Sequence, residues 1–514
     1  MNPPAASLTA GRSRWHNWIY AGLLALMAAL ALTNHSFWID ETYSARLAQQ
    51  PTPAACWHLL REVKGSDPQM PLYIFWLWTC EKFTGSREFA LRALNLFWFI
   101  PALVVLLRAV AGNRTLQGAV FIVALGSPFA WYYLNEARAY TMQFSTSLIL
   151  FAILWHWTRE KNLRLDCERG WALIFCAAFF CLCGSSLLSM ALATTPVLMA
   201  LILLPADRLG RFVKIFWRLW ASLLAFLFLL GIYYLWTLHS GDRATGIAGT
   251  NWKNPLFIAY ELLGFAGLGP GRLAIRGGTG MEVFKPYAPA LLLYAAVIAA
   301  LLWLALGELR QKLGSKKLAM LIIAVLLPAG LVLAASAHSH FRILGRHLAT
   351  LLPVAILLTG YGLAAAWRRG PAGRMLAGGF ICLYLSSALS LRFAARHDKD
   401  DYRTAAAIAR VALAERKIVW WSADTSAAFY YELPLAVQGV AETGRALWLA
   451  HPGLITVAGA ARPDVIIASR PDVYDERGII PEFARRENYQ LNTNVTAFQI
   501  WKRELNDRPA AQVK

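Results

Sequence analysis

Residues 18–43 read WIYAGLLALMAALALTNHSFWIDETY, an apolar run followed at its far end by the adjacent carboxylates Asp40 and Glu41. The apolar part, residues 18–33, approaches the length of about 20 residues that an α-helix needs to cross a bilayer. Charged groups beside a membrane are unfavourable unless they have partners or a function. The stretch therefore predicts a membrane-spanning helix that ends in a polar functional segment.

A similar pattern recurs further along the chain. Residues 131–140 read WYYLNEARAY, and they place Glu136 and Arg138 where one apolar run ends and the next begins. If the two polar segments lie on the same side of the bilayer, Asp40, Glu41 and Glu136 can belong to one site.

The composition indicates a polytopic membrane protein. The 514 residues are 57% hydrophobic and 16% charged, against an apolar share of about 45–50% in soluble domains. The formal net charge is +20, but Lys and Arg gather in short segments between apolar runs, as membrane orientation requires. The charge therefore indicates topology, and nucleic acid is not an expected partner.

Eleven apolar runs approach the length of a membrane-spanning helix. They cover residues 18–33, 90–108, 116–133, 139–157, 171–188, 190–205, 215–237, 286–307, 319–337, 348–367 and 375–393. The first run lacks a small-residue cleavage site, so we expect a retained helix and not a signal peptide.

The basic connectors between these runs set the expected orientation. They contain Arg12, Arg14, Arg108, Arg114, Arg159, Lys161, Arg164, Arg169, Arg208, Arg211, Lys214, Arg310, Lys312, Lys316, Lys317, Arg368, Arg369 and Arg374. With eleven spans and a cytoplasmic amino terminus, every one of them falls on the cytoplasmic side. The expected location is the bacterial inner membrane, with the carboxyl terminus in the periplasm.

One apolar run, Pro71 to Cys80, is too short to span, and counting it would put the later basic connectors outside. We therefore expect a shallow helix on the outer face, within a periplasmic loop over residues 34–89. The loop 238–285, the short loop 338–347 and the carboxyl-terminal tail are expected on the same face.

The tail, residues 394–514, has the alternating pattern of a small α/β domain. Residues 417–421 and 465–468 read as buried strands, residues 402–415 have helical periodicity, and residues 489–491 and 497–501 are a plausible strand pair. The expected domains are thus a transmembrane domain over residues 1–393 and a periplasmic domain over residues 394–514. No glycine motif for a nucleotide stands out in the tail.

The cysteines carry little information on function. Cys56 and Cys80 both lie in the expected outer loop, where a disulfide between them is an open alternative to two free thiols. The sequence contains no short Cys or His motif typical of a structural metal site.

Several segments, taken in order, resemble the motifs of bacterial family 39 glycosyltransferases. These are multispan GT-C enzymes related to protein O-mannosyltransferases and to the lipid A aminoarabinose transferase. The segments are residues 38–43 (WIDETY), 67–73 (DPQMPLY), 88–92 (EFALR), 127–140 and 345–348 (GRHL), with weaker matches at 400–403 and 462–465. Met70 and Asn135 depart from the family's usual Pro and Gln, so the acceptor type is not carried over.

The resemblance implies that a sugar is transferred from a polyprenyl phosphate, with inversion, outside the membrane. A carboxylate near an acceptor hydroxyl can take its proton, and Asp40 is the expected base, with Glu41 and Glu136 as further candidate catalytic residues. A lipid phosphate that leaves needs cations nearby; Arg138, Arg92 and Arg346 are the candidates. Tyr43, Tyr73 and Tyr140 are candidate substrate contacts. A divalent ion is a second way to stabilise the phosphate, with Asp40 and Glu136 as its ligands.

Each assignment has a structural alternative. Asp40 could cap a helix that begins near Thr42, and Glu41 could face solvent or orient Asp40. Glu136 could pair with an arginine, and Arg92 and Arg138 could anchor helix ends at lipid headgroups. The three tyrosines could belong to the interfacial aromatic belt.

A membrane transporter or lipid flippase is the alternative function. Its carboxylates would lie near the bilayer midplane on broken helices of two related halves, whereas the acidic residues of this chain lie at the ends of spans. The sequence does not identify the sugar or the periplasmic acceptor, which could be a lipid, a glycan or a protein.

Overall fold

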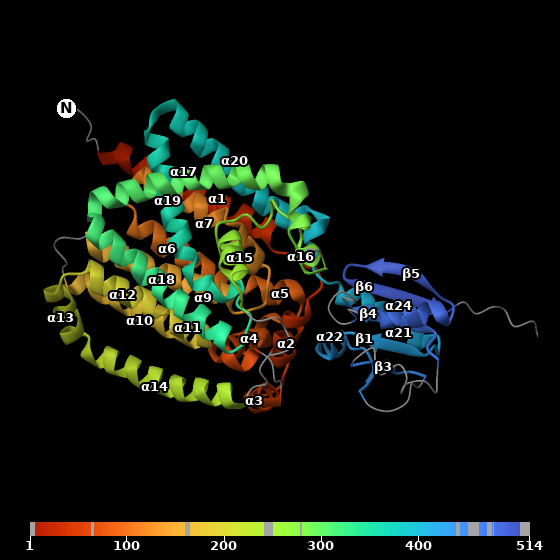
Figure 1. Ribbon diagram of the computed structural model, residues 1–514. Coiled ribbons are helices and arrows are strands. Elements are labelled where there is room, and N and C mark those ends of the chain that lie inside the picture. Colours follow the sequence, from red (N-terminus) through yellow and green to blue (C-terminus); the bar gives the residue numbers. More distant parts are fainter. Residues whose placement is uncertain are drawn as a thin grey trace, which may run out of the picture.

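The computed structural model describes residues 6–62, 66–159, 165–240, 250–277, 280–437, 443–450, 462–469, 475 and 477–503. A bundle of helices is followed by a small sheet domain at one end (Figure 1). The predicted fold class, a mostly helical membrane protein with a small α/β domain at its carboxyl end, is confirmed.

The first half of the bundle contains α1 (Ala6–Ala31), α2 (Ile39–Ala48), α3 (Pro53–Glu62), η1 (Asp67–Gln69), α4 (Pro71–Thr84), α5 (Glu88–Ala93), α6 (Leu96–Ala109), α7 (Arg114–Leu125), α8 (Pro128–Leu134), α9 (Tyr140–Arg159), α10 (Leu165–Ser185), α11 (Leu187–Leu192) and α12 (Thr194–Leu203). The second half contains α13 (Ala206–Ile215), α14 (Trp217–Ser240), α15 (Lys253–Leu262), α16 (Arg272–Gly277), η2 (Gly280–Tyr287), α17 (Ala288–Leu313), α18 (Ser315–His338), η3 (Gly345–Leu351), α19 (Leu352–Arg368), α20 (Gly370–Phe393) and η4 (Ala395–His397).

All eleven predicted spans overlap helices. By length and apolarity, six helical segments of the described residues are able to cross a membrane, or seven if the pair α7 and α8, bent by 48°, is one span. Three further apolar helices are shorter, and α9 is largely buried inside the bundle. The number eleven therefore stays a prediction.

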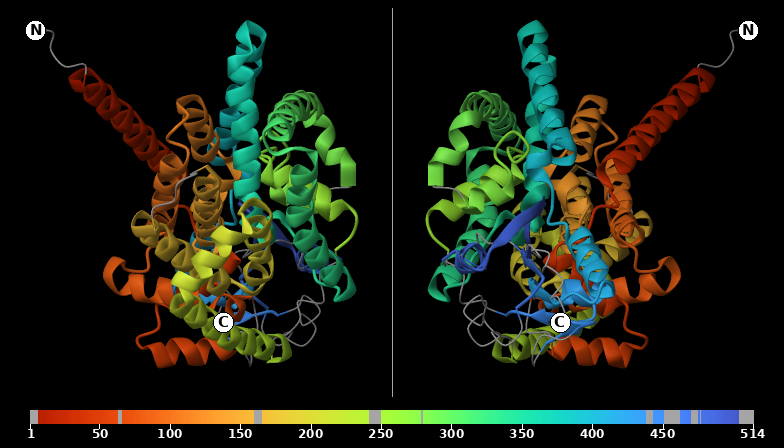
Figure 2. Two further views of the ribbon diagram at one scale, coloured as in Figure 1. Left: turned by 90° about the vertical axis from the view of Figure 1, so that its left-hand side faces the viewer. Right: turned by 90° about the vertical axis from the view of Figure 1, so that its right-hand side faces the viewer.

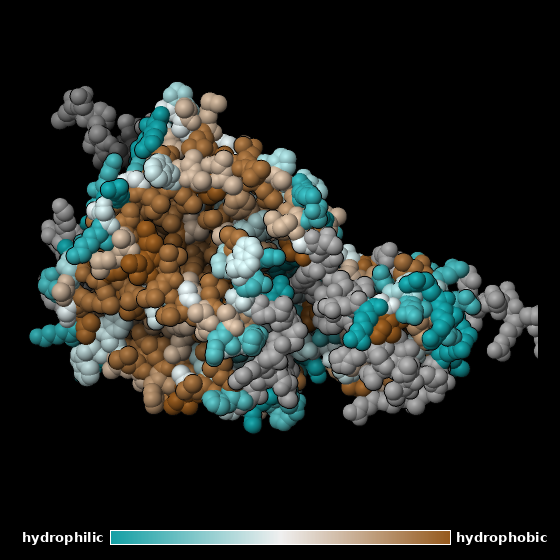
Figure 3. Space-filling model, in the orientation of Figure 1, coloured by the Kyte–Doolittle hydropathy of each residue, from teal (hydrophilic) through white to brown (hydrophobic). Residues whose placement is uncertain are grey.

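Many exposed apolar side chains lie on the helices of the bundle, and on the face drawn in Figure 3 they form a wide belt. Figure 3 shows this belt across the helices, with hydrophilic residues at the rim far from the sheet domain and on the sheet domain itself. Leu224, Phe228 and Leu229 of α14 are more than half exposed. Such a belt matches the hydrocarbon core of a bilayer. The segment Gly345–Arg368, by contrast, is mostly buried, and α19 within it is a central helix of the bundle.

Several basic connectors meet at the end of the bundle far from the sheet domain. Glu308 at the end of α17 pairs with Lys312 at 3.8 Å and with Arg368 at the end of α19. Arg208 of α13 donates to the Trp157 carbonyl at 3.5 Å, and α13 lies opposite the sheet domain (Figure 1). Helix α1 starts on the same far side (Figure 1), and in both views of Figure 2 it extends outward from the rest of the bundle. These connectors therefore share one end of the bundle, as the orientation rule requires.

The predicted shallow helix is α4. Pro71 occupies its first position, where a missing N–H costs nothing, and the helix is too short to be counted among the spans. Helices also occupy much of the predicted outer loop 238–285, since α15, α16 and η2 lie there; residues 241–249 and 278–279 lie outside the described residues.

The sheet domain contains α21 (Tyr402–Ala414), β1 (Val419–Ser422), α22 (Thr425–Tyr430), β2 (Leu435–Ala436), β3 (Ala446–Trp448), β4 (Val465–Ser469), α24 (Ile479–Arg486), β5 (Tyr489–Val495) and β6 (Phe498–Arg503). The strand order is β2-β3-β1-β4-β6-β5. Strands β2, β3, β1 and β4 are parallel to their neighbours, and β6 and β5 are added antiparallel.

Consecutive tryptophans show why β1 is apolar throughout. Trp421 packs with α21 on one face of the sheet, and Trp420 packs with α24 on the other. A strand buried on both faces reads as a continuous apolar run. The predicted strands at 417–421 and 465–468, the helix at 402–415 and the strand pair near 489–501 are all confirmed, whereas the short strands β2 and β3 were not predicted.

The sheet domain is fastened to the bundle through the segment before α2. The Tyr431 hydroxyl accepts the Phe37 N–H at 2.8 Å and lies 3.0 Å from the Ser36 hydroxyl. Arg403 pairs with Glu88 at 2.6 Å. These contacts place the sheet domain directly beside the predicted site residues.

Candidate functional site

Helix α2 carries Asp40 and Glu41. It begins at Ile39, with Trp38 as its extended N-cap residue, and both carboxylates occupy its first turn. There the positive end of the helix dipole stabilises their negative charge. The alternative that Asp40 caps the helix is therefore wrong. Because successive helix positions differ in direction by about 100°, Asp40 and Glu41 face different surroundings.

Glu41 points into the bundle and is completely buried. Arg92 donates to both of its oxygens, from Nε to Oε1 at 2.9 Å and from Nη2 to Oε2 at 2.8 Å. The Ala137 N–H adds a third bond at 2.9 Å. Burial opposes its charge, but Arg92 and Lys399 hold the pKa of Glu41 below its ordinary value. The alternative that Glu41 faces solvent is wrong.

Arg138 is held by a second buried carboxylate. Its Nη1 lies 2.8 Å from Asp67 Oδ1 and 2.9 Å from the Ser44 hydroxyl, and its Nη2 lies 2.8 Å from the Ser66 hydroxyl. The side chain is 1% exposed. Arg92 and Arg138 therefore do not lie at lipid headgroups, and their hydrogen bonds are largely taken up by the protein.

Asp40 differs from the other predicted carboxylates because its side chain remains 27% exposed. Arg346 donates to its Oδ2 at 3.1 Å and is itself 16% exposed. The Arg346 guanidinium lies 5.5 Å from the ring centre of Trp38 and 5.9 Å from that of Tyr140. The structure thus brings a partly accessible carboxylate and a partly accessible arginine together.

Glu136 is completely buried and faces Lys399, which lies in the connector between α20 and the sheet domain. The Lys399 Nζ lies 3.3 Å from Glu136 Oε1 and 3.6 Å from Glu41 Oε2. Burial raises the pKa of Glu136, against the opposing charge of Lys399, and burial lowers the pKa of Lys399. The alternative of a salt bridge for Glu136 is correct, with a lysine in place of the expected arginine.

The sheet domain holds the outer face of α2. The Tyr43 hydroxyl donates to Asp424 Oδ2 at 3.2 Å, and the Arg46 guanidinium lies 4.5 Å from the ring centre of Phe429. Ile39 packs against the core of the sheet domain. Helix α2 is therefore fixed from both sides, by the bundle through Glu41 and by the sheet domain through Tyr43.

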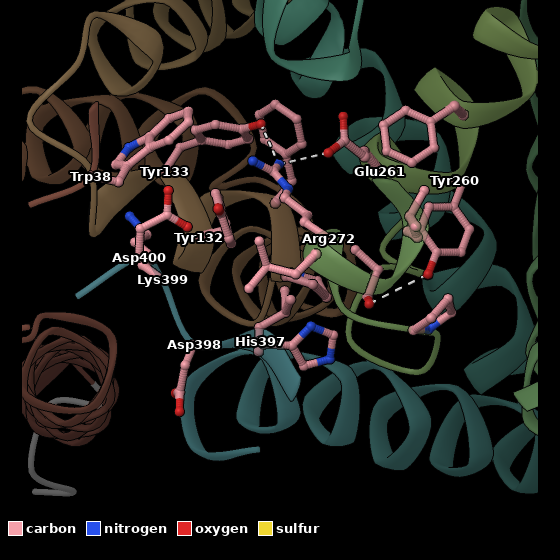
Figure 4. Close-up of a pocket in the computed structure, with 18 residues that line it drawn as sticks. Trp38, Tyr132, Tyr133, Tyr260, Glu261, Arg272, His397, Asp398, Lys399 and Asp400 are labelled. Atoms are coloured by element: carbon pink, nitrogen blue, oxygen red, sulfur yellow. Dashed lines mark hydrogen bonds and ion pairs between the residues drawn. The ribbon is translucent and has the colours of Figure 1, made fainter. Parts of the chain in front are cut away.

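A pocket with about 760 Å³ of empty space, part of it open to solvent, lies next to this cluster (Figure 4). Its polar wall residues come from four parts of the chain: the aromatic end of α8, the end of α15, the start of α16, and the connector after α20. They are Tyr132, Tyr133, Tyr260, Glu261, Arg272, His397, Asp398, Lys399 and Asp400, with Trp38 beside them. Phe129, Phe257, Leu273, Ile275 and Leu391 are among its apolar wall residues.

Arg272 is the arginine of this pocket. Its Nη2 donates to the Tyr133 hydroxyl and to Glu261 Oε1, both at 2.7 Å, and its guanidinium lies 3.9 Å from the ring centre of Tyr132 (Figure 4). The side chain is 29% exposed. Arg272 therefore retains N–H groups that a ligand can reach. The N–H groups of Arg92 and Arg138, by contrast, are largely bonded to buried protein groups.

A second pocket, with about 430 Å³ of empty space, lies on the other side of the connector. Thr33, His35, Asn135 and Arg392 are among its wall residues. Tyr132, Leu391, His397, Asp398 and Lys399 line both pockets, so the connector forms a shared wall.

Asp40, Glu136 and Arg138, which the sequence suggested for one site, line neither of these two pockets. Glu136 and Arg138 are buried inside the protein. The candidate substrate contacts are also not on these walls: Tyr73 is fully buried, Tyr140 is buried near Arg346, and Tyr43 bonds to Asp424.

Three residues of the cluster were not predicted from the sequence: Lys399, Arg272 and Glu261. Lys399 directly precedes Asp400, where a weak motif match begins, and this position was the available signal. Arg272 and Glu261 lie in a region that was interpreted only as a loop. Their pairing joins residues of α15 and α16 with the aromatic end of α8, which no local pattern indicates.

Metal ligation and disulfide bonding were both open questions. Among the described residues, no group of three His, Cys, Asp or Glu side chains is placed to hold a metal ion. Asp40 and Glu136, the expected ligands, are paired with Arg346 and Lys399 instead. Cys56 and Cys80 are separate free thiols.

No protein-family model matches the sequence, and no curated protein matches it. Among solved structures, the chain is similar to ArnT from Cupriavidus metallidurans in the apo state, with 13% sequence identity and a TM-score of 0.52, over 96% of this chain and 98% of that chain. The structure of the same protein bound to undecaprenyl phosphate gives 12% identity and a TM-score of 0.48, over 94% of this chain and 98% of that chain. The chain therefore has the fold of ArnT along almost its whole length.

Proposed function

We propose that this chain is an inverting glycosyltransferase that moves a sugar from a polyprenyl phosphate donor to an acceptor hydroxyl on the periplasmic side of the bacterial inner membrane. The fold supports the proposal, because ArnT is a GT-C glycosyltransferase. The ordered family 39 motifs of the sequence support it independently. The acceptor is a lipid, a glycan or a protein, and the sugar is a hexose or a pentose.

The observation that carries the proposal is the contrast between Asp40 and the other predicted carboxylates. Glu41 and Glu136 are completely buried, whereas Asp40 is 27% exposed beside Arg346. A base must reach the proton of the acceptor hydroxyl at hydrogen-bond distance. We therefore assign the role of the base to Asp40. We assign to Glu41 the role of holding α2 against the bundle and orienting it.

The phosphate of the donor requires cations that a ligand can reach. Arg346 and Arg272 are partly exposed, and both lie against aromatic side chains beside the pocket. A guanidinium binds phosphate oxygens with two parallel hydrogen bonds. We assign the phosphate to these two arginines, and we assign structural roles to Arg92 and Arg138.

The sugar and the lipid have different requirements. The rings of Trp38, Tyr132 and Tyr133 offer apolar faces and hydroxyl groups to a sugar. Drawing a polyprenyl chain into water costs about 0.8 kcal/mol for each methylene group, so the lipid must stay in the bilayer. The apolar wall residues Phe129, Phe257 and Leu391 give the pocket a side suited to the first isoprene units.

One observation favours the alternative function. The bent helix pair α7 and α8 leads directly to Glu136, and interrupted helices that end near charged groups are common in transporters. A transporter or lipid flippase would use the pair of Glu136 and Lys399 to carry protons.

Two assays separate these functions. Purified protein is incubated with a radiolabelled polyprenyl phosphate sugar and an envelope extract as the source of acceptor; in parallel, proteoliposomes are tested for proton-coupled uptake. We expect labelled product and no uptake. Uptake without sugar transfer would contradict the proposed enzyme function and support a transporter. Mass spectrometry of envelope glycolipids and glycoproteins, with and without the protein, then identifies the acceptor.

The proposed orientation has its own test. A reporter fused after Lys514 is expected in the periplasm, and a reporter inserted near Lys316 is expected in the cytoplasm. Finding both reporters on one side would contradict the arrangement.

A further inference from the structure

Lys399 occupies the wall that the two pockets share. It belongs to the connector that leads from α20 into the sheet domain, and its side chain is about 10% exposed. Its ammonium group also lies 5.0 Å from the ring centre of Tyr132, another residue of that wall. A cation at this place can meet a ligand in either pocket.

The contacts of Lys399 leave part of its hydrogen-bonding capacity unused. Its Nζ donates to the Asn135 carbonyl at 2.7 Å, but Glu136 and Glu41 lie further away, at 3.3 and 3.6 Å. Charged N–H···O bonds are usually about 2.7–2.9 Å long, and an ammonium has three N–H groups. Among its contacts with the described residues, only the bond to a neutral carbonyl is short, so both carboxylates hold Lys399 loosely.

Glu136 is the weaker of the two buried acidic partners. Within the described part of the chain, its one ion pair is the 3.3 Å contact with Lys399, whereas Glu41 accepts four hydrogen bonds from Arg92, Ala137 and Trp38. The charges that act on Glu136 are those of Lys399, Glu41, Arg272 and Arg346. If Lys399 turns away, the positive charges of Arg272 and Arg346 therefore still act on the Glu136 carboxylate.

We propose that Lys399 is a phosphate-binding residue, which leaves Glu136 and contacts the phosphate of the donor when the pocket fills. The inference rests on the proposed function for the identity of the anion, a polyprenyl phosphate. A lysine serves phosphate as a compact point charge, and Glu136 is its resting counter-ion. The exchange adds a third cation to Arg272 and Arg346.

The first test measures binding to the full-length protein in detergent. Farnesyl phosphate serves as a short polyprenyl phosphate, and farnesol serves as its neutral control. Because Lys399 would give the phosphate a charge-assisted hydrogen bond, Lys399→Met should weaken farnesyl phosphate binding by roughly tenfold or more. Farnesol binding should not change. Equal affinity of the wild-type protein for the two probes would overturn the proposal.

The second test removes an ambiguity, because Lys399→Met also leaves Glu136 buried without its counter-ion and can lower the melting temperature. The double variant Lys399→Met/Glu136→Gln removes both charges and should regain the melting temperature. We expect its binding of farnesyl phosphate to stay weak. Recovery of wild-type binding would show that Lys399 only neutralises Glu136, and would overturn the inference.

A single variant keeps the inference testable if the double variant does not fold. Glu136→Gln releases Lys399 and should leave phosphate binding equal or tighter; a loss as large as that of Lys399→Met would contradict the proposal. Lys417→Met is the matched control, since Lys417 is an exposed lysine paired with Glu415. Lys399-dependent binding without any sugar transfer would refute the proposed function and leave this inference intact.

Discussion

Two ion-pair regions begin at adjacent positions of α2. In the inner region, Arg92 with Glu41 and Arg138 with Asp67 are 0–4% exposed and are linked by several short hydrogen bonds. In the outer region, Arg346 with Asp40 is 16% and 27% exposed. Both regions pair arginines with carboxylates, but they differ in burial and in how many of their N–H groups and oxygens are already hydrogen-bonded. Inner pairs fix the position of α2, whereas the outer pair keeps groups that a substrate can reach.

The largest effect is expected from breaking an inner pair. Arg92→Leu leaves Glu41 buried without its partner, which should cost about 3–5 kcal/mol of the free energy of unfolding. Thermal unfolding followed by tryptophan fluorescence in detergent measures this loss. The double variant Arg92→Leu/Glu41→Leu should recover most of it. A normal melting temperature together with lost donor binding would instead make Arg92 a phosphate ligand.

The outer pair should respond in activity and not in stability. Asp40→Asn keeps the size of the side chain but removes the proton acceptor, so turnover should fall by roughly a hundredfold or more. Donor binding and the melting temperature should change little. Glu415→Gln, at an exposed carboxylate of the sheet domain that is paired with Lys417 and lines neither pocket, is the control and should stay active. Near-normal turnover of Asp40→Asn would remove Asp40 from catalysis.

A smaller effect, on donor affinity, is expected from changing Arg272, which is partly exposed like the outer pair. Arg272→Lys keeps a positive charge beside Glu261 but loses the planar fork that binds two phosphate oxygens, so KM for the donor should rise by roughly threefold to tenfold. Steady-state kinetics at saturating acceptor measure it. An unchanged KM would place the donor phosphate elsewhere.

The smallest effect is expected at Asp424, a half-buried carboxylate held by the Tyr43 hydroxyl and the Ala427 N–H. Burial raises the pKa of Asp424, so its contribution to stability is present below the unfolded pKa and is lost as pH rises through the folded pKa. Asp424→Asn keeps the helix cap and removes this loss. Its melting temperature should match the wild type at low pH and equal or slightly exceed it at neutral pH; a lower value at neutral pH would contradict this assignment.

The sequence predicted the helices and most of the sheet because their signals are local. Apolar runs such as 319–337 and the paired tryptophans of β1 are read directly from hydropathy and periodicity. The strands β2 and β3 were not predicted, because they are only 2 and 3 residues long.

The candidate site was only partly predictable. Asp40 and Arg346, 306 positions apart, were named from motifs, and the structure pairs them. Burial was not predictable, since whether Glu41 faces solvent depends on Arg92 and on the loop around Ala137. Lys399 was missed because it gains its role only where the connector passes Glu136.

The attachment of Phe37 and Tyr43 to Tyr431 and Asp424 has a consequence for biosynthesis. The partners Tyr431 and Asp424 lie 394 and 381 positions after Phe37 and Tyr43, beyond every helix of the bundle. Helix α2 therefore acquires these neighbours only after the whole bundle has been made. A chain cut between the bundle and the sheet domain would contain all the bundle helices and still lack these contacts, so synthesis of the sheet domain controls when the site is completed.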